Sequence, residues 1–363
     1  MARSSRRNDV HPISTRALNV LRVEDVTPAM RRVTLGGDQL RAFRSATGFA
    51  VADFRSTGFD DNLKIVLRHP DLDEPLVPTQ GDGALAWPRD PRSVVRTYTI
   101  RRWDPVAGEA DIDFVGHGSG PATSWAYRVQ PGELLHVAGP KMSRGYPEGV
   151  DWALVAGDET ALPAIGRWVE ESPAGLRAQV FVEVEERSHR QNLPVREGVS
   201  VTWLSRDGAA AGSTTLLLDA IRAAQWWEGS VFAWVAGEAT SLTPIRRWLR
   251  DEKGVPKENL DVVGYWRRGD DQPDATDASA ADDEETGHDD LHDRIDMVPP
   301  FAVSVGVTVG LFDALNRRPA TVTELAALTR TDEHGLGKLV RYLETLGAVV
   351  ADEGTYRLTA AGQ

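Results

Sequence analysis

The fold is decided by the stretch from Val94 to Ala126, which begins VVRTYTIRRW and ends DFVGHGSGPATSWA. The first part predicts a strand on which Arg96 and Tyr98 face the same way, because side chains alternate along a strand. The second part predicts a strand, a glycine-rich turn and a helix with Pro121 at its first position. A flat aromatic ring beside a guanidinium suits a ring system with a phosphate tail, and free N–H groups at a helix start suit an anion. Together the two parts predict a site for a planar, phosphorylated ligand.

The sequence around this stretch shows two patterns of predicted secondary structure. From about residue 18 to 139, short β runs are separated by turns with little helical periodicity, which predicts an antiparallel barrel or sandwich. From about 151 to 268, strands alternate with helices, which predicts a parallel sheet with flanking helices. We therefore expect one domain at 15–145 and a second at 150–268.

Two segments of the second domain resemble each other. Val155–Trp168 and Val235–Trp248 share eight of fourteen residues at an offset of 80. Each predicts a buried strand, a glycine turn with a threonine (Thr160 and Thr240) and a helix start, and both turns should open at the carboxyl edge of the sheet, where such sheets bind ligands. Neither turn is a G-x-G-x-x-G or Walker loop, so two ordinary capped connections remain the alternative.

The composition excludes several classes of protein. Cysteine is absent, which excludes disulfides, thiolate catalysis and cysteine-ligated zinc or iron–sulfur clusters. No window approaches the roughly 20 apolar residues of a membrane helix. No apolar segment follows the basic N-terminus, so we expect neither a membrane segment nor a secretory signal, and a cytoplasmic location.

The net charge of −13 is concentrated in one segment, since residues 269–293 hold eleven Asp and Glu and no Lys or Arg. Without them the chain carries a net charge of −2, which gives no overall attraction for nucleic acid. The same segment has almost no large apolar residues and cannot bury enough surface to offset its ordering entropy. We expect 269–293 to be an acidic disordered linker.

The C-terminal residues 294–363 predict a third domain. Three helices and a β-hairpin that turns at Glu353-Gly354 follow the order of a winged helix. The stretch from GLFDAL to YRLT resembles the N-terminal dimerisation domain of small-molecule O-methyltransferases. It holds seven Lys and Arg against eight Asp and Glu, so it lacks the basic surface of a DNA reader. We expect a homodimer or partner docking through this winged helix rather than nucleic-acid binding.

Four linked motifs resemble the siderophore-interacting protein family, which comprises flavin-dependent ferric-siderophore reductases related to the ferredoxin reductases. The motifs, in order over about residues 15–269, are RTYTIR, DFVGHGSGPATSWA with AGPKMS, AGDETALPAI, and AGE with IRRWL and GYWRRG. The resemblance implies a FAD-binding β-barrel and a nicotinamide-binding α/β domain in a ferredoxin-reductase-like arrangement. It implies NAD(P)H-dependent, FAD-mediated reduction of a ferric siderophore, which releases iron because siderophores hold Fe(II) far less tightly.

The resemblance also assigns roles to residues. The barrel strand would bind the flavin through Arg96, Thr97, Tyr98 and Thr99. The glycine-rich turn would form a second wall for the flavin phosphates, through His117, Gly118, Gly120, Ala122, Thr123 and Ser124. The nicotinamide cofactor would dock at Asp158, Glu159, Thr160 and Ala161, and the flavin region would be closed by Tyr265 and Trp266. The basic substrate-binding positions would be Lys64, Lys141 and Arg267.

The chain departs from the family pattern at two of these places. Met142 replaces a glycine in the family's GPRGS, and Gly118 replaces an acidic residue.

The sequence leaves three choices open. Arg187, His189 and Arg190 could hold the 2′-phosphate of NADPH, whereas Glu183 and Glu185 could hold the ribose diol of NADH. The basic candidates suit an anionic catecholate siderophore, but a hydroxamate siderophore or a role as plain surface cations is not excluded. The alternative function is a flavin-containing, redox-responsive regulator with a DNA-binding winged helix, and a general flavin or quinone reductase is a third.

Overall fold

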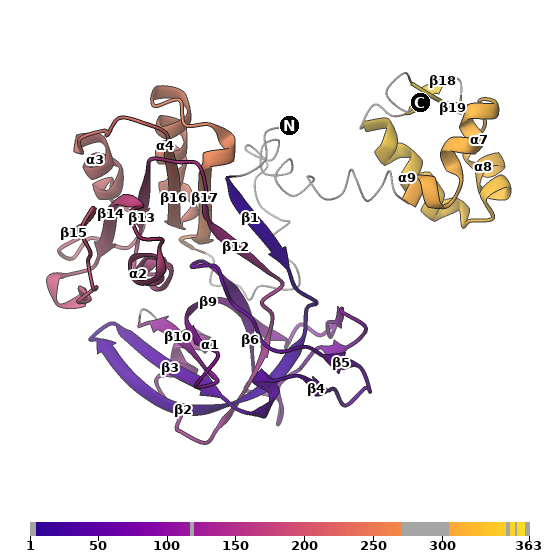
Figure 1. Ribbon diagram of the computed structural model, residues 1–363. Coiled ribbons are helices and arrows are strands. Elements are labelled where there is room, and N and C mark those ends of the chain that lie inside the picture. The colour runs from indigo at the N-terminus through magenta and orange to yellow at the C-terminus, as the bar shows by residue number, and fades with distance from the viewer. Residues whose placement is uncertain (1–4, 117–119, 270–304, 346–348, 353, 360–363) are drawn as a thin grey trace. The chain divides into compact units, whose positions relative to one another are not determined.

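The computed structural model forms two compact units, Met1–Ala278 and Ser279–Gln363, which are described separately below (Figure 1). The described residues are 5–116, 120–269, 305–345, 349–352 and 354–359. Apart from Gly269, the predicted linker at 269–293 lies outside the described residues, as do His117 and Gly118.

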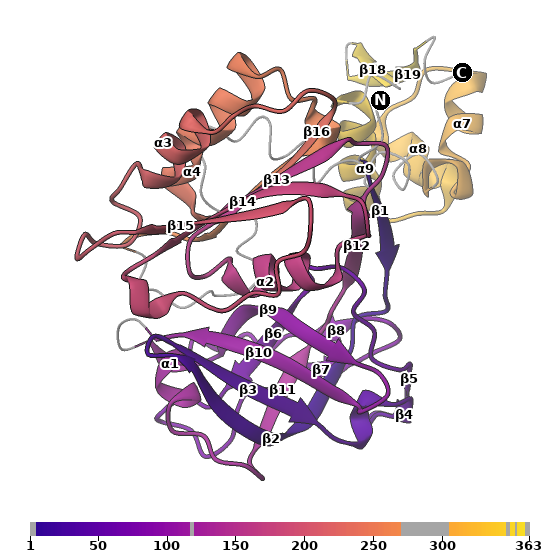
Figure 2. The same cartoon turned by 60° about the vertical axis from the view of Figure 1, so that its left-hand side comes forward.

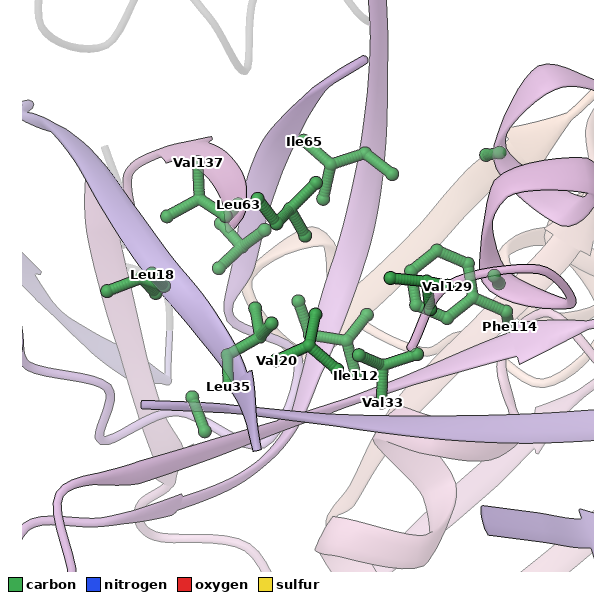
Figure 3. Close-up of a cluster of buried hydrophobic side chains, with 14 of the residues drawn as sticks. Leu18, Val20, Val33, Leu35, Leu63, Ile65, Ile112, Phe114, Val129 and Val137 are labelled. Carbon is green, nitrogen blue, oxygen red and sulfur yellow. The ribbon is translucent and has the colours of Figure 1, made fainter. Parts of the chain in front are cut away.

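The first domain is a closed barrel of six antiparallel strands in the order β10-β3-β2-β11-β6-β9. Its strands are β2 (Thr15–Thr27), β3 (Met30–Gly36), β6 (Asn62–Leu67), β9 (Val94–Asp104), β10 (Glu109–Val115) and β11 (Leu134–Ala138). The short elements around them are η1 (Asp38–Leu40), β4 (Phe43–Arg44), β5 (Ala50–Val51), β7 (Thr79–Gln80), β8 (Leu85–Ala86) and α1 (Pro121–Ala126). Figure 3 shows side chains from five of these strands meeting in the barrel core. The barrel prediction is confirmed.

The second domain is a five-stranded parallel sheet in the order β15-β14-β13-β16-β17. Its strands are β13 (Trp152–Gly157), β14 (Arg177–Val184), β15 (Val199–Ser205), β16 (Val231–Glu238) and β17 (Leu260–Trp266). Its helical elements are α2 (Leu162–Glu171), η2 (Arg187–His189), α3 (Leu216–Ala223), α4 (Ala239–Arg247), η3 (Trp248–Glu252) and η4 (Lys257–Asn259). The sheet separates two apolar clusters, which explains why β13 and β16 are buried at every position. Figure 2 shows the helices flanking the sheet.

The repeated segments lie side by side, because β13 and β16 are parallel neighbours. Their turns therefore open at one edge of the sheet, as the sequence predicts. The sheet order reverses at β13, which pairs with β14 on one side and with β16 on the other. Such a switch point is where open α/β sheets bind ligands.

The sequence analysis missed a strand at the N-terminus. Strand β1 (Arg6–Val10) pairs antiparallel with β12 (Met142–Pro147), which connects the two domains. Met142 pairs with Val10 in this ribbon. The methionine that replaces the family's glycine is thus accommodated as an ordinary strand residue.

The two domains pack through α2, which lies against β9. The buried Arg167 of α2 donates to the Ser56 side chain at 2.8 Å and to the backbone oxygens of Ser56 and Ile100 at 2.9 and 3.2 Å. In the opposite direction, Arg101 of β9 pairs with Glu170 of α2. These contacts make the barrel and the sheet one rigid support for residues at their boundary.

The second unit contains α7 (Leu311–Arg317), α8 (Val322–Thr329), α9 (Glu333–Thr345), β18 (Val349–Asp352) and β19 (Thr355–Leu358) around its own apolar cluster. A reciprocal capping box between Thr321 and Glu324 begins α8. The helices and the hairpin follow the predicted order, but the winged-helix assignment itself stays a prediction.

Among the described residues, no helix has the length and apolar character needed to cross a membrane.

Candidate functional site

Strand β9 presents the first group of predicted site residues. The Arg96 guanidinium donates to the backbone oxygen of Val95 at 2.8 Å and forms no ion pair with a described carboxylate. Thr97 is exposed. Tyr98 packs on Phe114 with ring centroids 4.4 Å apart, and burial raises the pKa of its phenol to about 12. The strand therefore offers a neutral aromatic ring beside a cation with spare donors.

Thr99 connects the barrel to the parallel sheet. Its side chain lies close enough to the phenol of Tyr265, near the end of β17, to lower the pKa of that phenol, although burial has the larger effect. Burial raises the pKa of Tyr265, so this phenol is neutral at physiological pH. The predicted flavin strand and the predicted closing residue thus meet directly, although 166 positions separate them in the sequence.

The glycine-rich turn is described only in part, because residues 117–119 lie outside the described ranges. Gly120 is the N-cap of α1, and a Cβ atom added to it would meet no atom of the described residues within 4 Å. Thr123 donates its hydroxyl to the Val115 backbone at 3.3 Å, and Ala122 is buried against the barrel. The N-cap backbone is therefore open to a ligand, whereas Thr123 and Ala122 hold the helix in place.

Of the three predicted substrate cations, only Lys64 lies on a strand. Lys64 of β6 pairs in register with Thr97 on one side and with Ala138 on the other. Lys141 follows shortly after Ala138, and neither lysine forms an ion pair within the described ranges. Arg267 is half-buried directly after β17.

Ser143, the last residue of the AGPKMS motif, anchors this connection. Its hydroxyl donates to the buried carboxylate of Asp61 at 2.6 Å. Asp61 also accepts from the side chain of Ser56 at 2.9 Å and from the backbone of Gly58 at 3.0 Å. Burial raises the pKa of Asp61. The motif therefore has a structural role at Ser143, next to the exposed Lys141.

Asp158 organises the edge of the sheet where the nicotinamide cofactor is predicted to dock. Its carboxylate accepts from the backbone and hydroxyl of Thr160 at 2.9 and 2.5 Å, from Trp266 Nε1 at 2.8 Å and from the Glu238 backbone at 3.1 Å. Burial raises the pKa of Asp158 despite these donors. The structure thus brings Asp158, Thr160 and Trp266 together, and it joins the two repeated turns through one carboxylate.

Sequence reasoning missed Arg206, which follows β15. Its guanidinium binds Glu159 in bidentate fashion at 2.7 and 2.8 Å and lies 3.4 Å from Glu183. Glu183 also accepts from the Thr214 hydroxyl at 2.9 Å, and burial raises its pKa. The only signal in the sequence was a charged residue at the carboxyl end of a strand on the same edge. Glu183 is therefore already occupied by protein donors and is poorly placed to bind a ribose diol.

The other candidates for nucleotide choice are partly accessible. Arg187 is exposed and has no partner among the described residues. Arg190 donates to the Ser205 hydroxyl at 3.2 Å, and His189 is buried beside the exposed Glu185 and Glu186. Of these residues, Arg187 is the cation left available to a phosphate.

The first unit holds two cavities that bear on the position of the site. The smaller, of about 120 Å³, is at the sheet edge and is lined by the carboxylates of Asp158, Glu183 and Glu238 among others. The larger, of about 620 Å³, is lined by residues such as Phe54, Trp103 and Arg167 and by none of the predicted site residues. The larger cavity therefore gives no support to the predicted site.

Comparisons with known proteins agree with this arrangement. Residues 19–144 match the model of the siderophore-interacting FAD-binding domain, and residues 150–269 match that of siderophore-interacting proteins. The crystal structure of a siderophore utilization protein from T. fusca is similar at 40% identity and a TM-score of 0.67, covering 73% of this chain and 97% of that one. Ferric vibriobactin reductase of Vibrio cholerae is 31% identical over 72% of this chain and 93% of its own length. NADPH-dependent ferric-chelate reductase of Escherichia coli is 31% identical over 72% of this chain and 94% of its own length.

Proposed function

Because the chain belongs to the siderophore-interacting protein family, we propose that it reduces ferric siderophores with electrons from NADPH or NADH through bound FAD, and so releases Fe(II). The observation that carries this proposal is the approach of Tyr265 to Thr99 across the domain boundary, beside the packing of α2 on β9. It sets the flavin-binding face of the barrel against the nucleotide-binding edge of the sheet. A hydride donor on one domain and its acceptor on the other can therefore meet at this boundary.

The residues of the barrel fit FAD. Arg96 keeps guanidinium donors for a pyrophosphate, since its described hydrogen bond goes to a neighbouring backbone oxygen. The open N-cap at Gly120 leaves room for a phosphate, and Tyr98 with Thr99 would contact the ring system and its ribityl chain. When bound, FAD supplies the conversion of a two-electron hydride donor into one-electron transfers, which no side chain provides. The protein's contribution is orientation, stacking and charge.

The sheet edge supports the nucleotide. Asp158 holds Thr160 and Trp266 in fixed positions, so the turn after β13 is rigid before the cofactor arrives. Trp266 and Tyr265 would then cover the flavin region. Arg187 favours the 2′-phosphate of NADPH, because Glu183 is sequestered by Arg206 and Thr214.

The substrate proposed is an anionic ferric siderophore of the catecholate type. Lys64 lies beside β9 and Lys141 follows β11, the other neighbour of β6, and neither has an ion-pair partner among the described residues. Arg267 would extend the same basic group from the end of β17. Cations in this position attract an anionic chelate and lower its dissociation constant. NAD(P)H is an intracellular reductant, so we place the reaction in the cytoplasm.

The test is turnover by the purified full chain. We expect a yellow protein that oxidises NADPH with a ferric catecholate chelate and forms Fe(II), which ferrozine traps as a coloured complex. The matched control contains FAD and NADPH without the protein, since free reduced flavin also reduces ferric chelates. A colourless protein that cannot be reconstituted with FAD would refute the function.

The remaining proposals concern the domains. We take 15–145 as the FAD domain, 150–268 as the nucleotide domain, 269–293 as a linker and 294–363 as a winged helix that forms a homodimer. Gel filtration of the full chain and of a chain ending at residue 269 tests the last point, because only the full chain should be a dimer. None of the relatives reported above is named as a regulator, so the regulator alternative gains no support.

A further inference from the structure

Arg6 on strand β1 is a buried arginine that contacts both domains. Its Nη1 donates to Asp60 at 2.8 Å and to Asp261 at 2.9 Å, and its Nη2 donates to Asp60 at 2.5 Å. Its Nε donates to the Gly145 backbone at 2.8 Å. The side chain has 0% exposure. Strand β1 lies outside the residues matched by either family model, so the family pattern does not account for this residue.

The partners of Arg6 come from distant parts of the chain. Asp60 precedes barrel strand β6, and Asp261 lies on β17 of the parallel sheet. Asp60 also accepts from Trp234 Nε1 of β16 at 3.1 Å. We call Arg6, Asp60, Asp261 and Trp234 the Arg6 cluster. It joins the N-terminal strand, the barrel and two strands of the sheet.

The charges of the cluster make Arg6 necessary to it. Burial disfavours the charged form of the Arg6 guanidinium and so lowers its pKa. The carboxylates of Asp60 and then Asp261 outweigh this effect, and the pKa of Arg6 is raised. Arg144 Nη1 lies 3.7 Å from Asp261 on the more exposed side. The guanidinium also lies over the Phe59 ring, 4.5 Å from its centroid. Removing Arg6 would leave Asp60 without its bidentate partner at the domain boundary.

The cluster is directly connected to the contact between Thr99 and Tyr265. Asp60 lies two residues before Asn62, which is the register partner of Thr99 on β9. Tyr265 lies at the register shift of β17, four residues after Asp261, and its ring packs edge-on against Trp234 of the cluster with centroids 6.3 Å apart. Arg6 therefore fixes the segments that carry both members of the contact.

We propose that Arg6 is a positioning residue for hydride transfer: it holds β17 against the barrel so that Tyr265 stays on Thr99 and the nucleotide reaches the flavin. This inference rests on the proposed function. Hydride transfer needs reacting atoms about 3–3.5 Å apart, and a displacement of about 1 Å can lower a rate about 100-fold. A small shift between the domains is therefore expected to slow this step without removing the flavin.

The first test requires neither flavin nor turnover. Amide hydrogen exchange of the apoprotein is compared between wild type, Arg6→Met and the control Arg7→Met, which changes the exposed neighbour on the same strand. We expect at least 10-fold faster exchange in residues 260–266 for Arg6→Met alone. Equal exchange in the wild type and Arg6→Met would refute the positioning role, whatever the enzyme activity.

The second test separates the two half-reactions in the reconstituted protein by anaerobic stopped-flow absorbance. For Arg6→Met we expect flavin reduction by NADPH to slow about 10- to 100-fold. Reoxidation by a ferric chelate and the Kd for FAD should change less than about 3-fold. Arg6→Lys, which keeps the charge, should recover part of the lost rate. Equal slowing of both half-reactions would show a general structural defect and overturn the inference.

A third variant guards against misfolding. Arg6→Met combined with Asp60→Asn and Asp261→Asn removes the uncompensated buried charges, so it should recover thermal stability. We expect its flavin reduction to stay slow, because the link between the segments is still missing. Full recovery of the rate together with stability would overturn the inference. If the wild type itself shows no reduction by NADPH, the proposed function fails, whereas the exchange test still decides the role of Arg6.

Discussion

Replacing Lys64 and Lys141 by alanine should weaken the binding of an anionic ferric chelate while leaving FAD in place. Lys64 lies on β6 beside β9, Lys141 follows β11 on the other side of β6, and neither forms an ion pair with a described carboxylate. A unit charge about 4 Å from an anion contributes about 1 kcal/mol in a water-like dielectric. Since 1.4 kcal/mol corresponds to tenfold, each lysine accounts for about 5-fold in KM and the pair for about 30-fold.

The assay measures KM for a ferric catecholate by ferrozine-coupled turnover, at low salt and again at about 1 M salt, where the Debye length falls to about 3 Å. We expect the 30-fold effect to shrink strongly at high salt and to be small for a neutral ferric hydroxamate. Lys338→Ala is the matched control, because Lys338 is exposed in the C-terminal unit. A KM that changes less than about 2-fold at low salt, or equally for charged and neutral chelates, would refute the reasoning.

Three further predictions follow from the site and its support. Arg187→Ala should weaken NADPH binding about 10-fold with little effect on NADH binding, whereas Glu183→Gln should change the Kd of either nucleotide by no more than about 2-fold. Calorimetric titration measures both. Weaker NADH binding by Glu183→Gln, with NADPH binding unchanged in Arg187→Ala, would contradict the role given to Arg187. Burial raises the pKa of Asp158 in the folded protein, so its contribution to stability is fully present at pH values below the ordinary aspartate pKa near 3.9 and is lost as the pH rises through the raised pKa. Asp158→Asn should flatten this part of the curve of unfolding free energy against pH, measured with denaturant. An unchanged slope would disprove the shift. Gly166→Ala places a Cβ 3.0 Å from Arg101 Nε, so it should destabilise by about 1–3 kcal/mol through overpacking, and an unchanged Tm would show that the helix can shift.

The sequence predicted the architecture of the first unit because its signals are local. The short β runs before residue 139 and the fully buried strands such as Trp152–Gly157 reflect burial on one face or on two, and this pattern is carried by neighbours in the chain. The repeat at an offset of 80 likewise predicted two turns on one edge, and the parallel pairing of β13 with β16 confirmed it. The motif around Arg96 and Tyr98 predicted a strand for the same reason, and β9 confirms the strand, while its role in binding flavin stays a prediction.

The partners of charged side chains could not be predicted in this way. Glu183 has the position expected of a ribose acceptor, yet Arg206 reaches it from another strand. Arg6 belonged to a basic N-terminal stretch with no evident role, and its partner Asp261 is 255 residues away. A sequence shows which residues carry charge, but the pairing of charges depends on how the strands are ordered and aligned.

The sequence by itself therefore determined the barrel, the parallel sheet and the family, because hydrophobic period and motif spacing are properties of short segments. Only the tertiary structure decided which side chains meet at the domain boundary, namely Thr99 with Tyr265 and Arg6 with both aspartates. These contacts join segments far apart in the chain. They exist because closing the barrel and stacking it on α2 bring those segments together, and no local pattern encodes that approach.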